Sequence, residues 1–155
     1  MNRKIKVESP GRINLIGEHV DYNGGSVLPG AIDKKVEFLI ENIEGNKCII
    51  ESKTINRKFE FGFSNLKKSN EHWQNYIIGT VNNLINKKKQ TISSFKCVIK
   101  SSLPIGAGIS SSSALISGLA YGLIEINNLQ IDKNEIVDIV SDVEHNYIGL
   151  KGGIM

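Results

Sequence analysis

A stretch of small and hydroxyl-bearing residues between positions 103 and 114 has the composition of an anion-binding loop. It reads Leu-Pro-Ile-Gly-Ala-Gly-Ile-Ser-Ser-Ser-Ser-Ala and is predicted to connect a strand to a helix. The unpaired backbone N–H groups and the dipole at the start of a helix attract phosphate. Gly106 and Gly108 let the backbone approach a ligand closely, and the serines offer oxygens to phosphate or Mg²⁺. The alternative interpretation is a glycine turn that opens a buried helix.

Two familiar nucleotide-binding motifs do not fit this loop. A Walker A loop needs Gly-Lys-Ser/Thr, and no lysine occurs between Lys100 and Lys133. The dinucleotide fingerprint needs a third glycine where Ser111 stands. A nucleotide bound here would therefore contact a serine-rich loop that contains no lysine.

Glu144 is a second candidate, because it lies at the edge of an apolar helical stripe. It follows Val140 by four residues and Val137 by seven, so the three share one side of a predicted helix. A carboxylate at such a position is either paired or bound to a cation. A partly solvated acid at the edge of the helix is the alternative.

The segment from Pro10 to Gly25 combines several polar side chains in one turn-rich stretch. Its residues Glu18, His19 and Asp21 could hydrogen-bond the hydroxyls of a small polyol such as a sugar. Arg12 could hold a phosphoryl group or an opposing carboxylate in a bidentate manner. An ordinary polar loop is the alternative interpretation.

Alternating and helical periodicities predict the elements that position these residues. A short strand around 5–7 is expected to stop at Ser9-Pro10-Gly11, and 10–31 are expected to be turn-rich. Strands at 36–41 and 48–50 are expected to form a hairpin, and further strands are predicted at 59–63 and 95–99. Helices are predicted at 73–85, 111–126 and, after a capping box at Asp132 and Glu135, up to Gly149. Strands precede helices, which indicates an α+β fold.

The composition places these elements in one globular domain. The chain has 155 residues, of which 40% are hydrophobic and 23% are charged. A net charge of +3 is too small to indicate nucleic-acid binding, and the lysine run 87–89 is expected to end a helix. Cys48 and Cys97 fit no zinc spacing and are predicted to be buried free thiols. No signal peptide or membrane span is visible, so we expect a soluble, cytoplasmic protein with no membrane or nucleic-acid partner.

Residues 10–25, 104–114 and 144–155 closely resemble three signatures of the galactokinases, a branch of the GHMP small-molecule kinases. The run Gly-Glu-His-Val-Asp-Tyr-Asn at 17–23 is the most specific, and His-Trp-Gln-Asn-Tyr at 72–76 is also similar. The resemblance implies an ATP-dependent phosphorylation of galactose to galactose 1-phosphate. It also implies the GHMP-kinase amino-terminal domain over 1–155, an α+β unit like domain 2 of ribosomal protein S5.

The resemblance further implies a role for each matching residue. Arg12 corresponds to a transition-state arginine, and Ser112 and Glu144 correspond to Mg²⁺ ligands. The residues implied to bind the sugar are Glu18, His19, Val20, Asp21 and Gly153. The residues implied to bind ATP are Ser52 near the adenine, with Trp73, and the phosphate loop Gly106, Ala107, Gly108, Ile109, Ser110, Ser111 and Ser112.

The sequence departs from the family after Gly-Ile-Met at 153–155, where galactokinases continue with a catalytic aspartate and a carboxyl-terminal domain. We therefore expect an incomplete galactokinase that is inactive alone and is a monomer when full length. A related N-acetylgalactosamine-type kinase and a non-catalytic sugar sensor are the alternatives. The undisturbed serine run at 110–113 favours catalytic ancestry.

Overall fold

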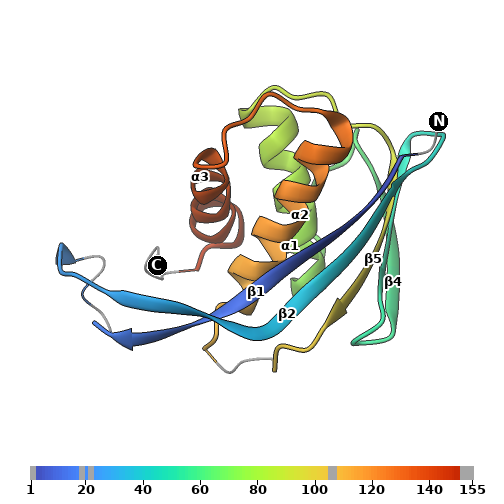
Figure 1. The fold of residues 1–155 in the computed structure, drawn as a ribbon. Coiled ribbons are helices and arrows are strands. Elements are labelled where there is room, and N and C mark those ends of the chain that lie inside the picture. The colour runs from blue at the N-terminus through green and yellow to red at the C-terminus, as the bar shows by residue number, and fades with distance from the viewer. Residues whose placement is uncertain (1–2, 18–19, 21–22, 105–107, 151–155) are drawn as a thin grey trace.

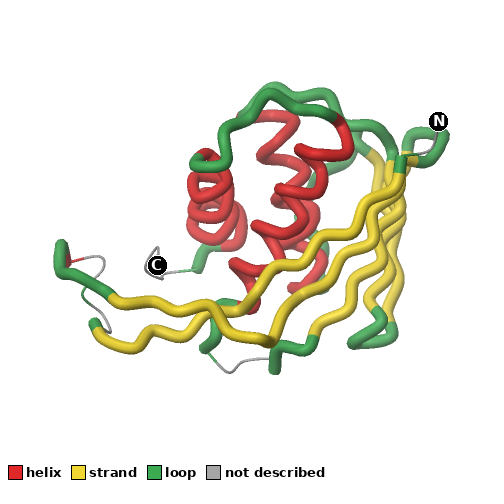
Figure 2. The backbone as a smooth tube through the Cα atoms, viewed as in Figure 1, coloured by secondary structure: helices red, strands yellow, loops and turns green. Residues whose placement is uncertain are grey.

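The computed structural model describes residues 3–17, 20, 23–104 and 108–150 (Figure 1). Within these residues the strands form one sheet, and the helices gather against one of its faces (Figure 2). The elements in chain order are β1 Lys4–Ile16, β2 Leu28–Asn42, β3 Lys47–Ser52, β4 Arg57–Gly62, α1 His72–Asn82, η2 Asn83–Lys87, β5 Phe95–Ser101, α2 Ser111–Asn127, α3 Glu135–Asp142 and η3 Val143–Ile148. The segments η2 and η3 are π-helical continuations of α1 and α3. The fold is α+β, as predicted.

The strands are ordered β1-β2-β5-β3-β4, so the hairpin expected from 36–50 is wrong. Both strands of that hairpin exist, but β5 lies between them, antiparallel to β2 and parallel to β3. The short loop after β2 passes the start of β5 and is fixed there. Ile43 N–H donates to Ser94 O at 2.9 Å, and Ser94 Oγ donates to Gly45 O at 2.7 Å. β3 instead forms its antiparallel pair with β4.

β1 does not stop at Ser9-Pro10-Gly11 but continues to Ile16, so the short strand expected around 5–7 is wrong in its end point. β1 is an edge strand of the described sheet and pairs with β2 alone. A proline can be accommodated on such a strand because the N–H that it lacks can face away from the partner. The register shifts between Pro10 and Arg12, so the strand is irregular there. β1 and β2 therefore form a long ribbon, and the turn-rich segment shrinks to the connection between them.

The hydrophobic core lies between the sheet and α2. Phe38 and Ile40 of β2 and Leu119 and Leu123 of α2 are fully buried. Gly118 brings the helix close to the strands: a Cβ there would overlap Phe38 Cε2 and would lie 2.8 Å from Ser9 Cβ. α2 also contacts α1 and α3, so it is the central helix of the layer.

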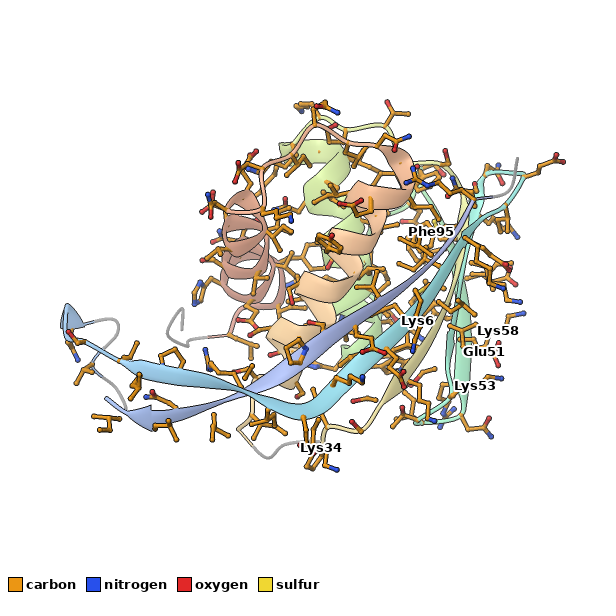
Figure 3. The ribbon with its side chains drawn as sticks, in the orientation of Figure 1. Lys6, Lys34, Glu51, Lys53, Lys58 and Phe95 are labelled. Atoms are coloured by element: carbon orange, nitrogen blue, oxygen red, sulfur yellow. The ribbon has the colours of Figure 1, made fainter. Side chains whose placement is uncertain are left out.

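The sheet face without helices carries paired charges (Figure 3). Lys6 forms ion pairs with Glu8 at 2.8 Å and with Glu37 at 3.0 Å, and Lys35 pairs with Glu8 at 2.5 Å. Each of these lysines therefore has an acidic neighbour, so this part of the face is not a strongly basic surface. In the part of the chain that is described, no helix is both long and apolar enough to cross a membrane.

Candidate functional site

The candidate phosphate loop connects β5 to α2, as the sequence predicts. Gly108 and Ser110 both adopt left-handed backbone angles, with φ of 67° and 57°. This conformation is unfavourable for a residue with a side chain, and it occurs preferentially at functional sites. Ser110 O accepts a hydrogen bond from Ala114 N–H at 2.9 Å, which starts the helix. Gly106 and Ala107 lie outside the described residues.

Arg12 lies on β1 directly beside this loop. Its backbone N–H donates to Ile109 O at 3.1 Å, although the two residues are almost a hundred positions apart. The neighbouring Gly11 is buried, and a Cβ there would overlap Leu103 and would lie 3.1 Å from Ile109 O. A residue larger than glycine would therefore require the Leu103 side chain to move and the loop at Ile109 to shift slightly.

Glu144 lies on η3 and reaches the first turn of α2. Ser113 Oγ donates to Glu144 Oε1 at 3.0 Å. The sequence analysis paired Glu144 with Ser112, whose side chain is half-buried in the same turn. It did not single out Ser113, because a run of serines does not reveal which hydroxyl faces a distant segment.

Polar contacts fix the junction of α3 and η3 against η2 and the segment before α1. Asp142 accepts hydrogen bonds from Asn83 Nδ2 at 2.6 Å and Asn146 Nδ2 at 2.7 Å, and it forms an ion pair with Lys87. Tyr147 Oη donates to Leu66 O at 3.0 Å. π-helical segments such as η3 occur frequently at functional sites.

The donor chemistry around Glu144 fits a hard cation that prefers oxygen ligands. Glu144, Ser112 and Ser113 offer a carboxylate and two hydroxyls at the start of α2. Among the described residues there is no group of three or more His, Cys, Asp or Glu side chains that could hold a metal. A cation held here would therefore take most of its remaining ligands from a nucleotide and water, as Mg²⁺ commonly does.

A small cavity joins Ser52 and Trp73, the two residues expected near an adenine. Its volume is about 120 Å³, and Leu115 of α2 also lines it. Trp73 packs edge-on against Phe59, with ring centres 5.0 Å apart. Close to the same cavity, Thr54 Oγ1 accepts a hydrogen bond from Ser101 N–H at 2.7 Å. The cavity thus has apolar walls and a few polar atoms, a composition that is common in small-molecule sites.

The first turn of α1 connects this cavity to Glu144. Trp73 and Tyr76 are three residues apart and lie on neighbouring positions of the helix surface. The pKa of Tyr76 is raised, mainly by burial and further by the negative charge of Glu144. Trp73 therefore lies at the cavity, whereas Tyr76 lies close enough to Glu144 to respond to its charge.

Most of the expected sugar-binding residues lie outside the described part of the chain. These are Glu18, His19, Asp21 and Gly153. Val20 is described, and its carbonyl accepts from Asn23 N–H at 3.1 Å and from Gly25 N–H at 2.8 Å. Val20 therefore lies in the turn between β1 and β2.

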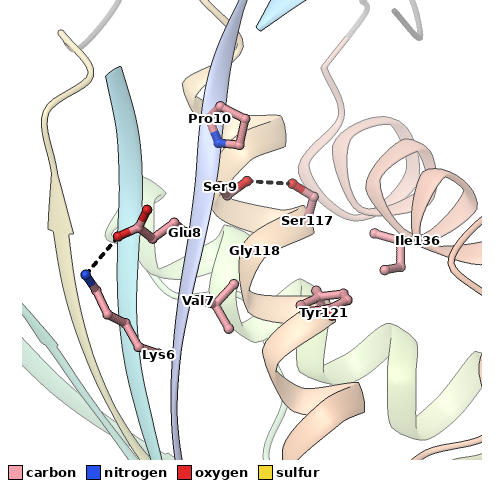
Figure 4. Close-up of a pocket in the computed structure, with 9 residues that line it drawn as sticks. All are labelled: Lys6, Val7, Glu8, Ser9, Pro10, Ser117, Gly118, Tyr121 and Ile136. Atoms are coloured by element: carbon pink, nitrogen blue, oxygen red, sulfur yellow. Dashed lines mark hydrogen bonds and ion pairs between the residues drawn. The ribbon is translucent and has the colours of Figure 1, made fainter. Parts of the chain in front are cut away.

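A larger cavity of about 410 Å³ lies between β1 and α2 (Figure 4). Ser9 Oγ and Ser117 Oγ are 3.1 Å apart on its wall, and Tyr121 and Ile136 also line it. None of the candidate-site residues that the structure describes lines this cavity.

Comparisons with known proteins agree with this geometry. Residues 2–41 match the galactokinase galactose-binding signature, and residues 75–155 match the GHMP kinases N terminal domain. Galactokinases of Thermosipho africanus and Thermotoga maritima are 44% and 40% identical over 97% of this chain. The chain spans 41% of the length of each of these relatives.

Solved structures show the same fold. Lactococcus lactis galactokinase complexed with galactose matches 98% of this chain and 40% of its own, with a TM-score of 0.91 and 33% identity. Methanococcus jannaschii mevalonate kinase, at 22% identity and a TM-score of 0.79, shares the fold over 92% of this chain and 46% of its own. The strand–loop–helix around the serine run and the helical segment that carries Glu144 both lie within the region that matches the N-terminal domain. The chain therefore belongs to the GHMP kinases.

Proposed function

We propose that this chain supplies the nucleotide- and sugar-binding part of a galactokinase, which transfers the γ-phosphoryl group of ATP to the anomeric hydroxyl of galactose. The observation that carries the proposal is the hydrogen bond from Arg12 N–H to Ile109 O at 3.1 Å. It joins the strand within the galactose-binding signature to the loop that precedes α2. A sugar and a triphosphate bound to these two segments would therefore lie next to each other.

In this proposal ATP lies along the start of α2. The cavity of Ser52 and Trp73 takes the adenine, and the N–H groups of residues 106–112 bind the phosphates. Ser112 and Glu144 would hold Mg²⁺, which when bound neutralises charge between the phosphates. The position of Glu144 supports this assignment, because the hydrogen bond from Ser113 Oγ places its carboxylate at the first turn of α2, which also carries Ser112.

The sugar occupies the turn between β1 and β2 in this proposal. Glu18 and Asp21 accept hydrogen bonds from galactose hydroxyls, and His19, Val20 and Gly153 complete the site. Arg12 lies between the sugar and the phosphates, where its guanidinium stabilises the charge of the transferring group. The match to the galactose-binding signature supports this part.

The proposed partners are the two small substrates, galactose and ATP. A cytoplasmic, monomeric protein without nucleic-acid or membrane partners is consistent with the paired charges on the open sheet face. The small net charge of +3 supports the same view.

A binding experiment on the 155-residue chain tests the proposal. Titration calorimetry measures ATP with Mg²⁺, and saturation-transfer NMR measures galactose, glucose and N-acetylgalactosamine. We expect galactose to bind at least about tenfold more tightly than glucose, because a site that hydrogen-bonds a hydroxyl rejects a sugar that misplaces it.

The variant Asp21→Ala distinguishes galactose binding from ATP binding. One hydrogen bond to a charged group contributes about 1.5–3 kcal/mol, so galactose affinity should fall about 10- to 100-fold while ATP affinity is unchanged. Asp33→Ala, an exposed acid on β2, is the matched control and should change neither. A chain that binds ATP but does not bind galactose would contradict the sugar assignment. A preference for N-acetylgalactosamine would favour an N-acetylgalactosamine-type kinase.

A further inference from the structure

Ser113 has a contact that neither the phosphate loop nor the Mg²⁺ ligand pair accounts for. It is the third residue of α2, and its hydroxyl donates to Glu144 Oε1 at 3.0 Å across 31 residues of sequence. Both side chains are half-buried, so the hydrogen bond is partly shielded from water. A hydrogen bond to a carboxylate is stronger than one between neutral groups.

The backbone on both sides of this contact is already fixed. On one side, the first turn of α2 is set by the left-handed Ser110 and by the bond from Ala114 N–H to Ser110 O at 2.9 Å. On the other side, the contacts of Asp142 with Asn83 and Asn146 hold the start of η3. The side-chain torsions of Glu144 are what remains to be fixed, and Ser113 restrains them.

Ser112 and Ser113 leave the helix in different directions, because neighbouring residues are rotated by about 100° around an α-helix. The hydroxyl that contacts Glu144 belongs to Ser113. The two serines therefore have separate roles, and Ser112 stays available as the hydroxyl ligand of the proposed function.

We infer that Ser113 is a positioning residue that orients the Glu144 carboxylate toward a divalent cation bound together with a nucleoside triphosphate. The inference rests on the proposed function. Before the nucleotide arrives, Ser113 holds the carboxylate at the start of α2, so less side-chain freedom is lost when the cation binds. Partners that orient a ligand in this way typically change metal affinity by about 10- to 100-fold.

The test measures cation binding directly and does not depend on turnover. Mn²⁺ replaces Mg²⁺ because it accepts the same oxygen ligands and is visible by electron paramagnetic resonance. The 155-residue chain is titrated with Mn²⁺ at a fixed ATP concentration, and ATP binding without metal is measured separately by calorimetry. Ser113→Ala should weaken the binding of Mn²⁺ with ATP about tenfold and leave metal-free ATP binding within about twofold.

Two further variants isolate the hydroxyl. Ser113→Thr keeps it and should retain affinity within about threefold. Ser117→Ala removes a hydroxyl one turn further along α2. That hydroxyl lies 3.1 Å from Ser9 Oγ, so its loss should leave Mn²⁺ binding unchanged. Thermal unfolding of each variant shows whether the fold is intact.

A double-mutant cycle with Glu144→Gln shows whether Ser113 acts through that carboxylate. The combined variant should be no weaker than Glu144→Gln alone. Equal Mn²⁺ affinity for the unchanged chain and Ser113→Ala would overturn the inference, and so would an equal loss in metal-free ATP binding. If the unchanged chain bound no ATP with Mn²⁺ at all, the proposed function itself would be contradicted.

Discussion

Replacement of Gly118 by alanine should destabilise the protein by separating α2 from the sheet. The added Cβ would overlap Phe38 Cε2, and it would lie 3.0 Å from Phe38 Cζ and 2.8 Å from Ser9 Cβ. Phe38 is 1% exposed, so its ring cannot turn toward solvent, and Ser9 is held in β1. The strain must therefore be relieved by a movement of the helix or the strands.

The size of the effect follows from two opposing contributions. Overpacking a core costs up to about 3 kcal/mol, and alanine gains about 1 kcal/mol over glycine in helix propensity. The free energy of unfolding should fall by about 2 kcal/mol, which lowers Tm by about 4–8 °C in a domain of this size. Urea denaturation followed by circular dichroism measures the first quantity, and a thermal melt measures the second.

Gly122→Ala is the matched control, because it adds the same methyl group one turn later in the same helix. Its Cβ would meet the end of the flexible Ile40 side chain and would lie 3.3 Å from Val7 Cγ2. Only the terminal methyl of Ile40 has to move, by rotation about its last side-chain bond, which a rigid ring such as Phe38 cannot do. The change in unfolding free energy should therefore stay below about 1 kcal/mol. If Gly118→Ala were as stable as the unchanged chain, or if both variants lost the same stability, the packing argument would be refuted.

Three further predictions concern single groups. The ion pairs with Lys35 and Lys6 lower the pKa of Glu8 to about 2, so the stability that Glu8 contributes is present above about pH 4.5 and is lost as the pH falls toward 2. Glu8→Gln should therefore reduce stability at pH 6 more than at pH 3, as measured by urea denaturation. Burial raises the pKa of the Cys97 thiol and raises that of Cys48 to about 12, so Ellman's reagent should react with two thiols only after unfolding. Trp73 is the single tryptophan of the chain, so its fluorescence should change saturably with ATP and Mg²⁺ and stay constant with galactose alone.

The sequence predicted the helices well because their signals are local. α2 begins at Ser111 and ends at Asn127, close to the expected 111–126. Of the capping box expected before α3, one half is present, since Asp132 N–H donates to Glu135 Oε1 at 3.1 Å. The Asp132 side chain accepts from Asn134 N–H at 2.7 Å instead of from Glu135 N–H, and Asn134 is the N-cap residue of the helix. Side chains within three positions of each other supply these signals, so no distant residue is needed to interpret them.

The predicted strand pairing was wrong where a strand distant in sequence, and not the next strand along the chain, became the neighbour of β2. A short turn between two alternating segments favours a hairpin, yet β5 enters from about fifty residues away and separates β2 from β3. The alternating pattern identifies which side chains face the core, but it does not identify the neighbouring strand. In the same way, Pro10 suggests a break, whereas an edge strand accommodates it.

The candidate site was predicted residue by residue but not as a set of contacts. Helical spacing identified Glu144, loop composition identified the serine run, and the family resemblance implied Ser112 as the partner of Glu144. In the structure Ser113 contacts Glu144, the second residue of the π-helical η3 that continues α3. No local sequence signal marks the transition from α3 to η3, so the contact could be found only in three dimensions.

Because α2 belongs to both the core and the candidate site, packing and nucleotide binding should be coupled. Its middle rests on the sheet at Gly118, while its first turn carries Ser113 against Glu144. A ligand present at one hundred times its dissociation constant stabilises the folded state by about 2.7 kcal/mol. That gain exceeds the loss of about 2 kcal/mol expected for Gly118→Ala, so saturating ATP with Mg²⁺ should restore its stability. If the substitution also shifts the first turn of α2, ATP will bind more weakly and will stabilise the folded state less. The difference between the expected and the observed stability with ATP therefore measures how strongly the core and the nucleotide site are coupled.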